Sequence, residues 1–183
     1  MANQSKSFVL VKDVKVYGGF AGTEVILADR DLGLNANATI LSGDLNGDDG
    51  ANFANYSDNV HHVILAVGDL GTALVDGVTI TGGNANDIPT VIIRVKEFDI
   101  SPYDGGGIYC KSASLTFSNI NICANSVKNA GGAIYNAGDE NTWSTLTINN
   151  AKIKGNKAVS GAAAENNSYA TLNLSNVLIS ENT

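Results

Sequence analysis

Residues 105–125 read GGGIYCKSASLTFSNINICAN, and this pattern returns twice further along the chain. The second copy is GGAIYNAGDENTWSTLTINNAKIKGN at residues 131–156, and the third is GAAAENNSYATLNLSNVLISEN at residues 161–182. Two asparagines keep their places, stepping by 31 and then 26 residues: Asn119, Asn150 and Asn176, and likewise Asn125, Asn156 and Asn182. Internal repetition at a period of about 20–50 residues is typical of a solenoid or another repeat array.

Apolar and polar residues alternate with period two inside each copy, over runs too short for helices. Such short strands cannot bury an apolar face alone, whereas stacked copies pair equivalent strands at about 4.8 Å. We therefore predict an all-β solenoid of parallel strands with coils of 26–31 residues, in which most asparagines are structural and stack in ladders. The inward residues should stack copy on copy: Ile108, Leu115, Phe117, Ile120 and Ile122 on Ile134, Leu146, Ile148, Ala151 and Ile153.

Residues 1–183 are expected to form one β-solenoid domain. Residues 1–60 form a cap or the first coils, and residues 61–183 form the repeat coils. An earlier copy ends in DGVTITGGN, where Gly77 takes the place of Asn119 and Asn84 that of Asn125. An insertion at 87–104, bracketed by proline, should fold back over the coils as an extra strand.

One segment favours a short helix. Residues 23–31 read TEVILADRD, with Thr23 as the expected N-cap. Within it, Arg30 lies between Asp29 and Asp31, which indicates a structural ion pair rather than a catalytic base.

Charge and composition exclude several classes of function. Eleven Lys and Arg against eighteen Asp and Glu give a net charge of −7, which argues against nucleic acid as a partner. No apolar run is long enough to span a membrane, and no signal peptide is visible. The pattern continues to the last residues, so we expect a fragment of a longer chain. Cys110 and Cys123 are the two cysteines, interpreted as buried free thiols, with a disulfide left open.

Several stretches carry a resemblance to a known family: VYGGFAGTE at residues 16–24, TILSGD at 39–44, DGVTITGGNA at 76–85 and the Gly-Gly-Ala-Ile strands. Together they resemble the bacterial right-handed parallel β-helix proteins with repeats like those of polymorphic outer-membrane proteins. The family's Phe-x-x-Asn is absent as spelled, since Asn119 follows Phe117 by two. The resemblance implies a right-handed parallel β-helix, an extracellular or cell-surface location and frequent adhesive use. It implies no fixed activity.

The best candidate for a metal site is GDLNGDDG at residues 43–50. Asp44, Asn46 and Asp48 place oxygen ligands at alternate positions, as a Ca²⁺ loop does. Asp49 stands where an EF-hand requires Gly, so we favour a polar turn with side-chain-to-backbone hydrogen bonds and keep Ca²⁺ as the alternative. No other cofactor is predicted.

Other candidates for chemistry are weaker. Asp139, Glu140, Glu165 and Glu181 stand at different offsets, so no catalytic residues are predicted for a lyase or hydrolase. His61 and His62 should point to opposite faces of a strand, one into solvent, and cannot share a metal ion. Tyr109 and Tyr135 hold matching offsets and should stack at a turn.

The sequence leaves two functions open. The first is a non-enzymatic β-helix module acting as a stalk, adhesin or self-assembling unit, whose partner is a host protein, a glycan or another copy at the open coil ends. The alternative is a carbohydrate-binding or polysaccharide-degrading module similar to the pectate lyases, with the 87–104 insertion and the Asp44–Asp49 loop shaping a groove.

Overall fold

The computed structural model describes residues 3–33, 38–86 and 93–183 and is built of strands joined by turns. Within these residues the helices are three short 3₁₀ turns: η1 (Leu27–Asp29), η3 (Ala51–Phe53) and η4 (Tyr56–Asp58). The chain is therefore all-β, as the alternating pattern predicts. Asparagine and glycine, which are poor residues for a helix interior, flank or enter η3 and η4.

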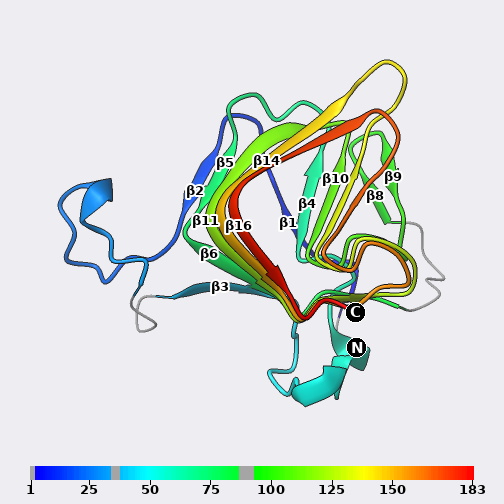
Figure 1. Ribbon diagram of the computed structural model, residues 1–183, viewed down its shortest axis with the longest axis horizontal. Coiled ribbons are helices and arrows are strands. Elements are labelled where there is room, and N and C mark those ends of the chain that lie inside the picture. The colour runs from blue at the N-terminus through cyan, green and yellow to red at the C-terminus, as the bar shows by residue number, and fades with distance from the viewer. Residues whose placement is uncertain (1–2, 34–37, 87–92) are drawn as a thin grey trace.

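The repeats contribute strands to two main parallel sheets. The first has the order β1-β4-β10-β13-β15: β1 (Phe8–Val9), β4 (Ile64–Val67), β10 (Ile108–Lys111), β13 (Ile134–Ala137) and β15 (Ala164–Asn166). The second has the order β2-β5-β11-β14-β16: β2 (Lys15–Tyr17), β5 (Leu74–Asp76), β11 (Ser114–Cys123), β14 (Ser144–Lys154) and β16 (Ala170–Ser180). In Figure 1 the second sheet curls around the first.

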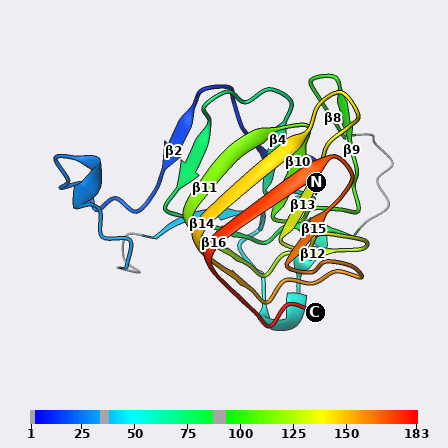
Figure 2. The same cartoon turned by 45° about the horizontal axis from the view of Figure 1, so that its top comes forward.

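Shorter strands complete the framework. β3 (Thr39–Ser42) pairs with β6 (Val78–Thr81), which pairs with the second half of β11. β7 (Asn84–Ala85) and β12 (Ser126–Val127) form a small parallel pair. β8 (Ile93–Val95) and β9 (Phe98–Ile100) form an antiparallel hairpin. Figure 2 shows β11, β14 and β16 following one another across the molecule, with β10, β13 and β15 doing the same.

Equivalent residues of successive repeats pair in register, as the sequence predicts. Ile108 pairs with Ile134, Phe117 with Ile148 and Ile122 with Ile153. All ten predicted inward residues are buried, and even Leu115, which has the largest exposed fraction among them, is only 6% exposed. Burying a side chain of this size stabilises the fold by about 1.5–3 kcal/mol. The apolar columns between the two sheets therefore supply the main cohesion between repeats.

Each long strand bends at one asparagine with a left-handed backbone. Asn119, Asn150 and Asn176 have φ of 53°, 52° and 53°, and Gly77 has 76° at the same place in the preceding repeat. A straight strand would point Phe117 and Ile120 to opposite faces, because side chains alternate. The left-handed residue at position 119 shifts the alternation of side chains by one residue, so Phe117 and Ile120 both face the core. Asparagine tolerates this conformation better than most residues, as predicted.

The register corrects one alignment made from the sequence. Asn84 pairs with Ser126, which places Gly83, not Asn84, opposite Asn125. Gly83 has no side chain, and its backbone N–H donates to Asn125 Oδ1 at 2.9 Å. Aligning Asn84 with Asn125 by their sequence motifs is therefore wrong by one residue relative to the observed strand pairing. The match of Gly77 to Asn119 is correct, since Asp76 pairs with Ser118.

The expected helix at residues 23–31 is reduced to η1, and Thr23 is not its N-cap. Ile26 holds the N-cap position. The Glu24 carboxylate instead accepts the backbone N–H groups of Ala21, Gly22 and Thr23 at 2.7–3.0 Å. This local turn uses the N–H donors before a longer helix can begin.

The insertion is an antiparallel hairpin rather than one extra strand. Residues 87–92, with Pro89, lie outside the described residues, and the rest of 87–104 contains β8 and β9. Ile93 and Ile100 pack with Leu65, Val67 and Tyr109. The hairpin thus folds back over the outer face of the first sheet, as expected.

Candidate functional site

The predicted Ca²⁺ loop closes around the carboxylate of Asp44. Four backbone N–H groups donate to it at 2.6–3.3 Å, those of Asn46, Gly47, Asp48 and Asp49. Partial desolvation raises the pKa of Asp44, but the four N–H donors outweigh it and leave the pKa lowered. These are the hydrogen bonds of the polar turn that the sequence favours.

A third carboxylate, missed by the sequence analysis, joins this loop. Oxygens of Asp44, Asp48 and Asp58 lie within 4.8 Å of one another. Asp58 lies 12 residues after Asn46, whose backbone N–H donates to it at 3.0 Å. Sequence spacing gave no signal for Asp58, because the chain returns to the loop only through η3 and η4. Calcium binding by Asp44, Asn46 and Asp48 stays the alternative to the polar turn, and Asp58 would add an oxygen donor to it.

Both neighbouring histidines are buried, which corrects the expectation that one faces solvent. His61 is 5% exposed and His62 is 0% exposed. His62 Nδ1 lies 3.0 Å from the carbonyl oxygen of Gly105, and its ring packs on Tyr109 with centroids 5.4 Å apart. Burial lowers the pKa of His62 to about 4. The later repeat covers the His62 ring, and His61 Nδ1 lies 3.4 Å from the carbonyl oxygen of Asn84; a strand pattern read locally could not reveal either contact.

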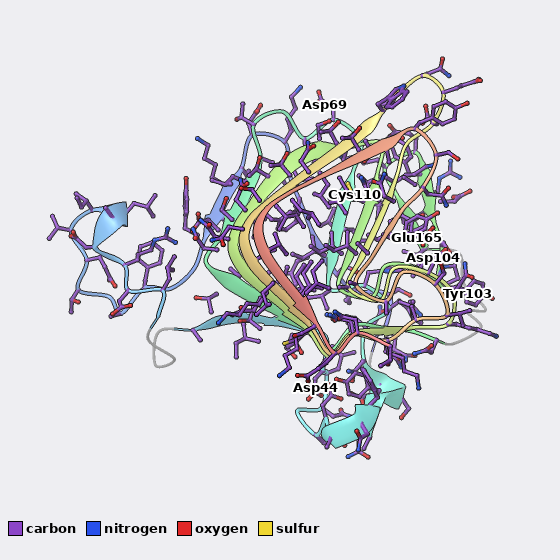
Figure 3. All side chains as sticks on the ribbon, viewed as in Figure 1. Asp44, Asp69, Tyr103, Asp104, Cys110 and Glu165 are labelled. Carbon is purple, nitrogen blue, oxygen red and sulfur yellow. The ribbon has the colours of Figure 1, made fainter. Side chains whose placement is uncertain are left out.

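The carboxylates considered for catalysis have separate partners. Asp139 accepts from Ser112 Oγ at 2.8 Å, Glu165 from Ser160 Oγ at 3.0 Å, and Glu181 pairs with Lys154 at 3.2 Å. Figure 3 places Asp44, Asp69 and Glu165 in three different regions of the molecule. Asp139 and Glu165 thus each accept from a serine hydroxyl, and Glu181 pairs with an ammonium group.

Arg30 forms the ion pair that its sequence context predicts, but with a distant partner. Its Nη2 lies 2.8 Å from Asp76 Oδ1, with side chains only 8% and 12% exposed, and its Nη1 donates to the carbonyl oxygen of Gly18 at 2.7 Å. The guanidinium also lies over the rings of Tyr17 and Phe20 at 5.4 Å. These contacts fix residues 18–33 against the second sheet. Arg30 therefore has a structural role: it holds the 18–33 segment in place.

The cysteines are free thiols in different sheets. Cys110 is buried in β10, and its Sγ lies 3.3 Å from Ser144 Oγ, whereas Cys123 ends β11 and is partly exposed. Burial raises the pKa of Cys110 to about 11. This thiol is a packed core group and a poor nucleophile at neutral pH.

The tyrosine pair is confirmed, within strands rather than at a turn. Tyr109 of β10 and Tyr135 of β13 pair in register and stack with ring centroids 5.2 Å apart. A second aromatic contact joins Trp143 and Tyr169, edge to face at 5.9 Å.

A column of asparagines, here called the inner ladder, joins successive repeats: Asn125, Asn156 and Asn182. The first two are buried and Asn182 is half-buried. Asn156 is 0% exposed. Its Oδ1 accepts from the N and Nδ2 of Asn125 at 3.1 and 3.0 Å, and its own N and Nδ2 donate to Asn182 Oδ1 at 3.0 and 2.9 Å. Its Nδ2 also donates to the carbonyl oxygen of Ile122 at 3.0 Å. Both hydrogens and both lone pairs of this amide are therefore used.

A second column, here called the outer ladder, lies on the surface at the strand bends: Asn119, Asn150 and Asn176. Asn150 Nδ2 donates to Asn119 Oδ1 at 3.3 Å, and Asn176 Nδ2 donates to Asn150 Oδ1 at 2.8 Å. Asn119 Nδ2 continues the chain to Asp76 Oδ2 at 3.0 Å, the carboxylate that Arg30 holds. Asn150 and Asn176 are exposed.

The outer ladder lines a hollow of about 360 Å³, here called the outer groove, whose lining includes Leu32, Asn121, Lys152 and Leu178. A smaller hollow of about 110 Å³ shares Leu32, Asn119 and Asn121 with it and adds Thr39 and Thr79. Together they form a polar surface across several repeats. The sequence predicted the ladder but not the groove, because the wall at Leu32 comes from the distant 18–33 segment.

Comparison with protein-family models, with curated proteins and with solved structures finds no match for this chain. Within the described residues, no helix has the length and apolar character needed to cross a membrane.

Proposed function

We propose that this chain is a module of a right-handed parallel β-helix in a bacterial surface or secreted protein, acting without catalysis as a stalk, an adhesin or a self-assembling unit. The observation that carries the proposal is the unbroken register of the second sheet. β2, β5, β11, β14 and β16 pair in parallel from one repeat to the next. In a stack of this kind each repeat contacts only its neighbours, so an extended array can be built by adding repeats.

The resemblance of VYGGFAGTE, TILSGD and DGVTITGGNA to the polymorphic outer-membrane protein repeats supports the extracellular location. Self-assembly draws support from the strand edges. β15 and β16 are the last strands of the two main sheets, and β1 and β2 are the first. Unpaired strand edges recruit further strands, so under this proposal the edge pairs with a second copy or with the next coil of a longer chain.

Non-enzymatic action draws support from the dispersed carboxylates. The alternative of a polysaccharide-degrading module needs two carboxylates about 5–9.5 Å apart on either side of a bound sugar. Asp139, Glu165 and Glu181 instead bond to separate hydroxyl and lysine groups. The acidic loop at Asp44 is the one cluster of three such groups found in the described part of the chain, and its oxygens face loop amides.

The test combines turnover and association. Pectate, alginate, xylan and mannan are incubated with the folded chain in Ca²⁺ or in EGTA, and new reducing ends and unsaturated uronides are measured. We expect no product, together with concentration-dependent association in sedimentation velocity. Product formation that disappears in Asp44→Ala or Asp48→Ala would overturn the non-enzymatic function, and a strict monomer would overturn self-assembly.

A further inference from the structure

The outer ladder has hydrogen-bonding capacity that the fold does not use. A carboxamide carries two N–H donors and two acceptor lone pairs. Asn150 uses one donor, toward Asn119, and one lone pair, toward Asn176. One N–H group and one lone pair therefore remain for a ligand at this exposed residue. The inner ladder at Asn156 has no such remainder.

These free groups recur at a regular spacing. Asn119, Asn150 and Asn176 come from β11, β14 and β16, which are successive neighbours in one parallel sheet. Neighbouring strands lie about 4.8 Å apart, so the three amides span roughly 10 Å along the stack. A ligand that uses all three must present hydroxyl groups at a similar repeat. Each sugar ring in a linear polysaccharide advances the chain by a distance close to one strand spacing.

The walls of the outer groove add apolar contact and little charge. Leu32 is 43% exposed on one side and Leu178 is 60% exposed on the other, and each can pack on the C–H face of a sugar ring. Lys152 is the single charged side chain among the described residues that line the larger hollow. Amides with two leucines suit a neutral, hydroxyl-rich ligand better than an acidic polymer.

Other ligand classes fit less well. A peptide strand would pair along an open backbone edge. Of the three ladder strands only β16 has one, whereas Asn119 and Asn150 sit in β11 and β14, which have paired neighbours on both sides. Nucleic acid would need a cluster of cations, and the chain has a net charge of −7.

The geometry points to the outer groove as a binding site for a short segment of a linear, neutral polysaccharide, read by the free amide groups of Asn119, Asn150 and Asn176. The inference deepens the proposed adhesive function and rests on it, since it names the partner class. The anchoring of Asn119 through Asp76 to Arg30 holds the ladder in place before a ligand arrives, which lowers the ordering cost of binding.

The test uses the full chain labelled with ¹⁵N, because side-chain amides give their own NMR signals. Cellohexaose, mannohexaose, xylohexaose and laminarihexaose are titrated separately, with tetragalacturonate as the acidic counterpart. We expect at least one neutral hexasaccharide to shift the amide signals of Asn119, Asn150 and Asn176. Asn150→Gly and Asn176→Gly should each weaken its binding by about fivefold, the effect of one hydrogen bond. Glycine keeps the left-handed backbone at both positions.

The matched control is Asn173→Ala. Asn173 is an exposed asparagine of β16, the strand that carries Asn176, but it lies outside the groove, so this variant should bind as the native chain does. Two results would overturn the inference. One is the absence of ladder shifts with every neutral hexasaccharide, and the other is binding of tetragalacturonate alone, lost in Lys152→Met. Cleavage of a bound hexasaccharide would instead contradict the non-enzymatic function while leaving the binding site in place, so the two failures are distinguishable.

Discussion

The inner and outer ladders are built from the same residue at the same repeat spacing, yet their amides do different things. Asn156 of the inner ladder is buried, and its side-chain amide is fully hydrogen-bonded to Asn125, Asn182 and a backbone carbonyl. Asn150 of the outer ladder is exposed and bonds once in each direction. A repeated residue therefore has a structural role where burial saturates its amide, and remains available to a ligand where it does not.

The largest effect should come from breaking the inner ladder. Asn156→Ala would leave two buried groups without the side chain they bond: the backbone N–H of Asn125 and the carbonyl oxygen of Ile122. Each unsatisfied group costs about 1–3 kcal/mol, and we expect the free energy of unfolding to fall by about 3–4 kcal/mol. Urea denaturation measures this. A loss below about 1 kcal/mol would mean that the buried amide is dispensable.

The inner ladder should not respond to acid, because amides do not titrate, and His62 is the buried group expected to do so. Burial holds the pKa of His62 at about 4 in the folded chain, below its ordinary value of 6.5. The unfolded chain therefore binds more protons between these values, and stability falls as pH drops from about 6.5 to 4. The contribution of His62 to this loss of unfolding free energy should be of order 3 kcal/mol, and it should level off below pH 4.

The matched variant His62→Phe separates this contribution from that of the carboxylates. It should unfold with a flatter dependence on pH over the same window, as measured by urea denaturation at each pH. An equal slope in both proteins would show that His62 is not the group responsible.

In the first repeat, the position of the inner ladder is held by Asp44 of the acidic loop at residues 44–49, so a carboxylate replaces the amide. Ser42 pairs with Thr81, which pairs with Cys123, so Asp44 holds the place of Gly83 and Asn125. Its carboxylate bonds four loop amides, and Asp44→Ala should cost about 1–2 kcal/mol in urea denaturation, like the loss of a helix cap.

Thermal melts in EGTA and in Ca²⁺ compare the two interpretations of this loop. We expect the native chain to melt at the same temperature in both, since the loop amides already occupy the carboxylate of Asp44. A stabilisation by Ca²⁺ that disappears in Asp58→Asn would establish instead the metal site predicted at Asp44, Asn46 and Asp48.

The smallest effect should come from the outer ladder. Asn150→Gly removes two exposed hydrogen bonds and keeps φ near 52°, so we expect at most about 1 kcal/mol of lost stability. Asn150→Val, which also loses the amide, should cost more because a β-branched residue is strained at this backbone angle. A loss for Asn150→Gly as large as that for Asn156→Ala would remove the distinction between the ladders.

Features of the fold that depend on residues close together in the sequence could be predicted from it. Alternation located the buried residues, and the asparagine spacing located both ladders, because strand pairing preserves each offset. The right-handed path of the chain came from the family resemblance and stays a proposal.

Contacts distant in the sequence could not be predicted. Arg30 meets Asp76 across 46 residues, and His62 is covered by Gly105, 43 residues later. The groove needs Leu32 from an excursion whose course no repeat specifies. Asn84 was misaligned because Gly83, which holds the ladder position, has no side chain to mark it.

The most direct measurement is hydrogen exchange of the asparagine side-chain amides by NMR in the native chain. We predict strong protection at Asn125 and Asn156, and exchange close to that of a free amide for the second N–H of Asn150 and Asn176. Equal protection in the two ladders would contradict the claim that only one of them is free to bind.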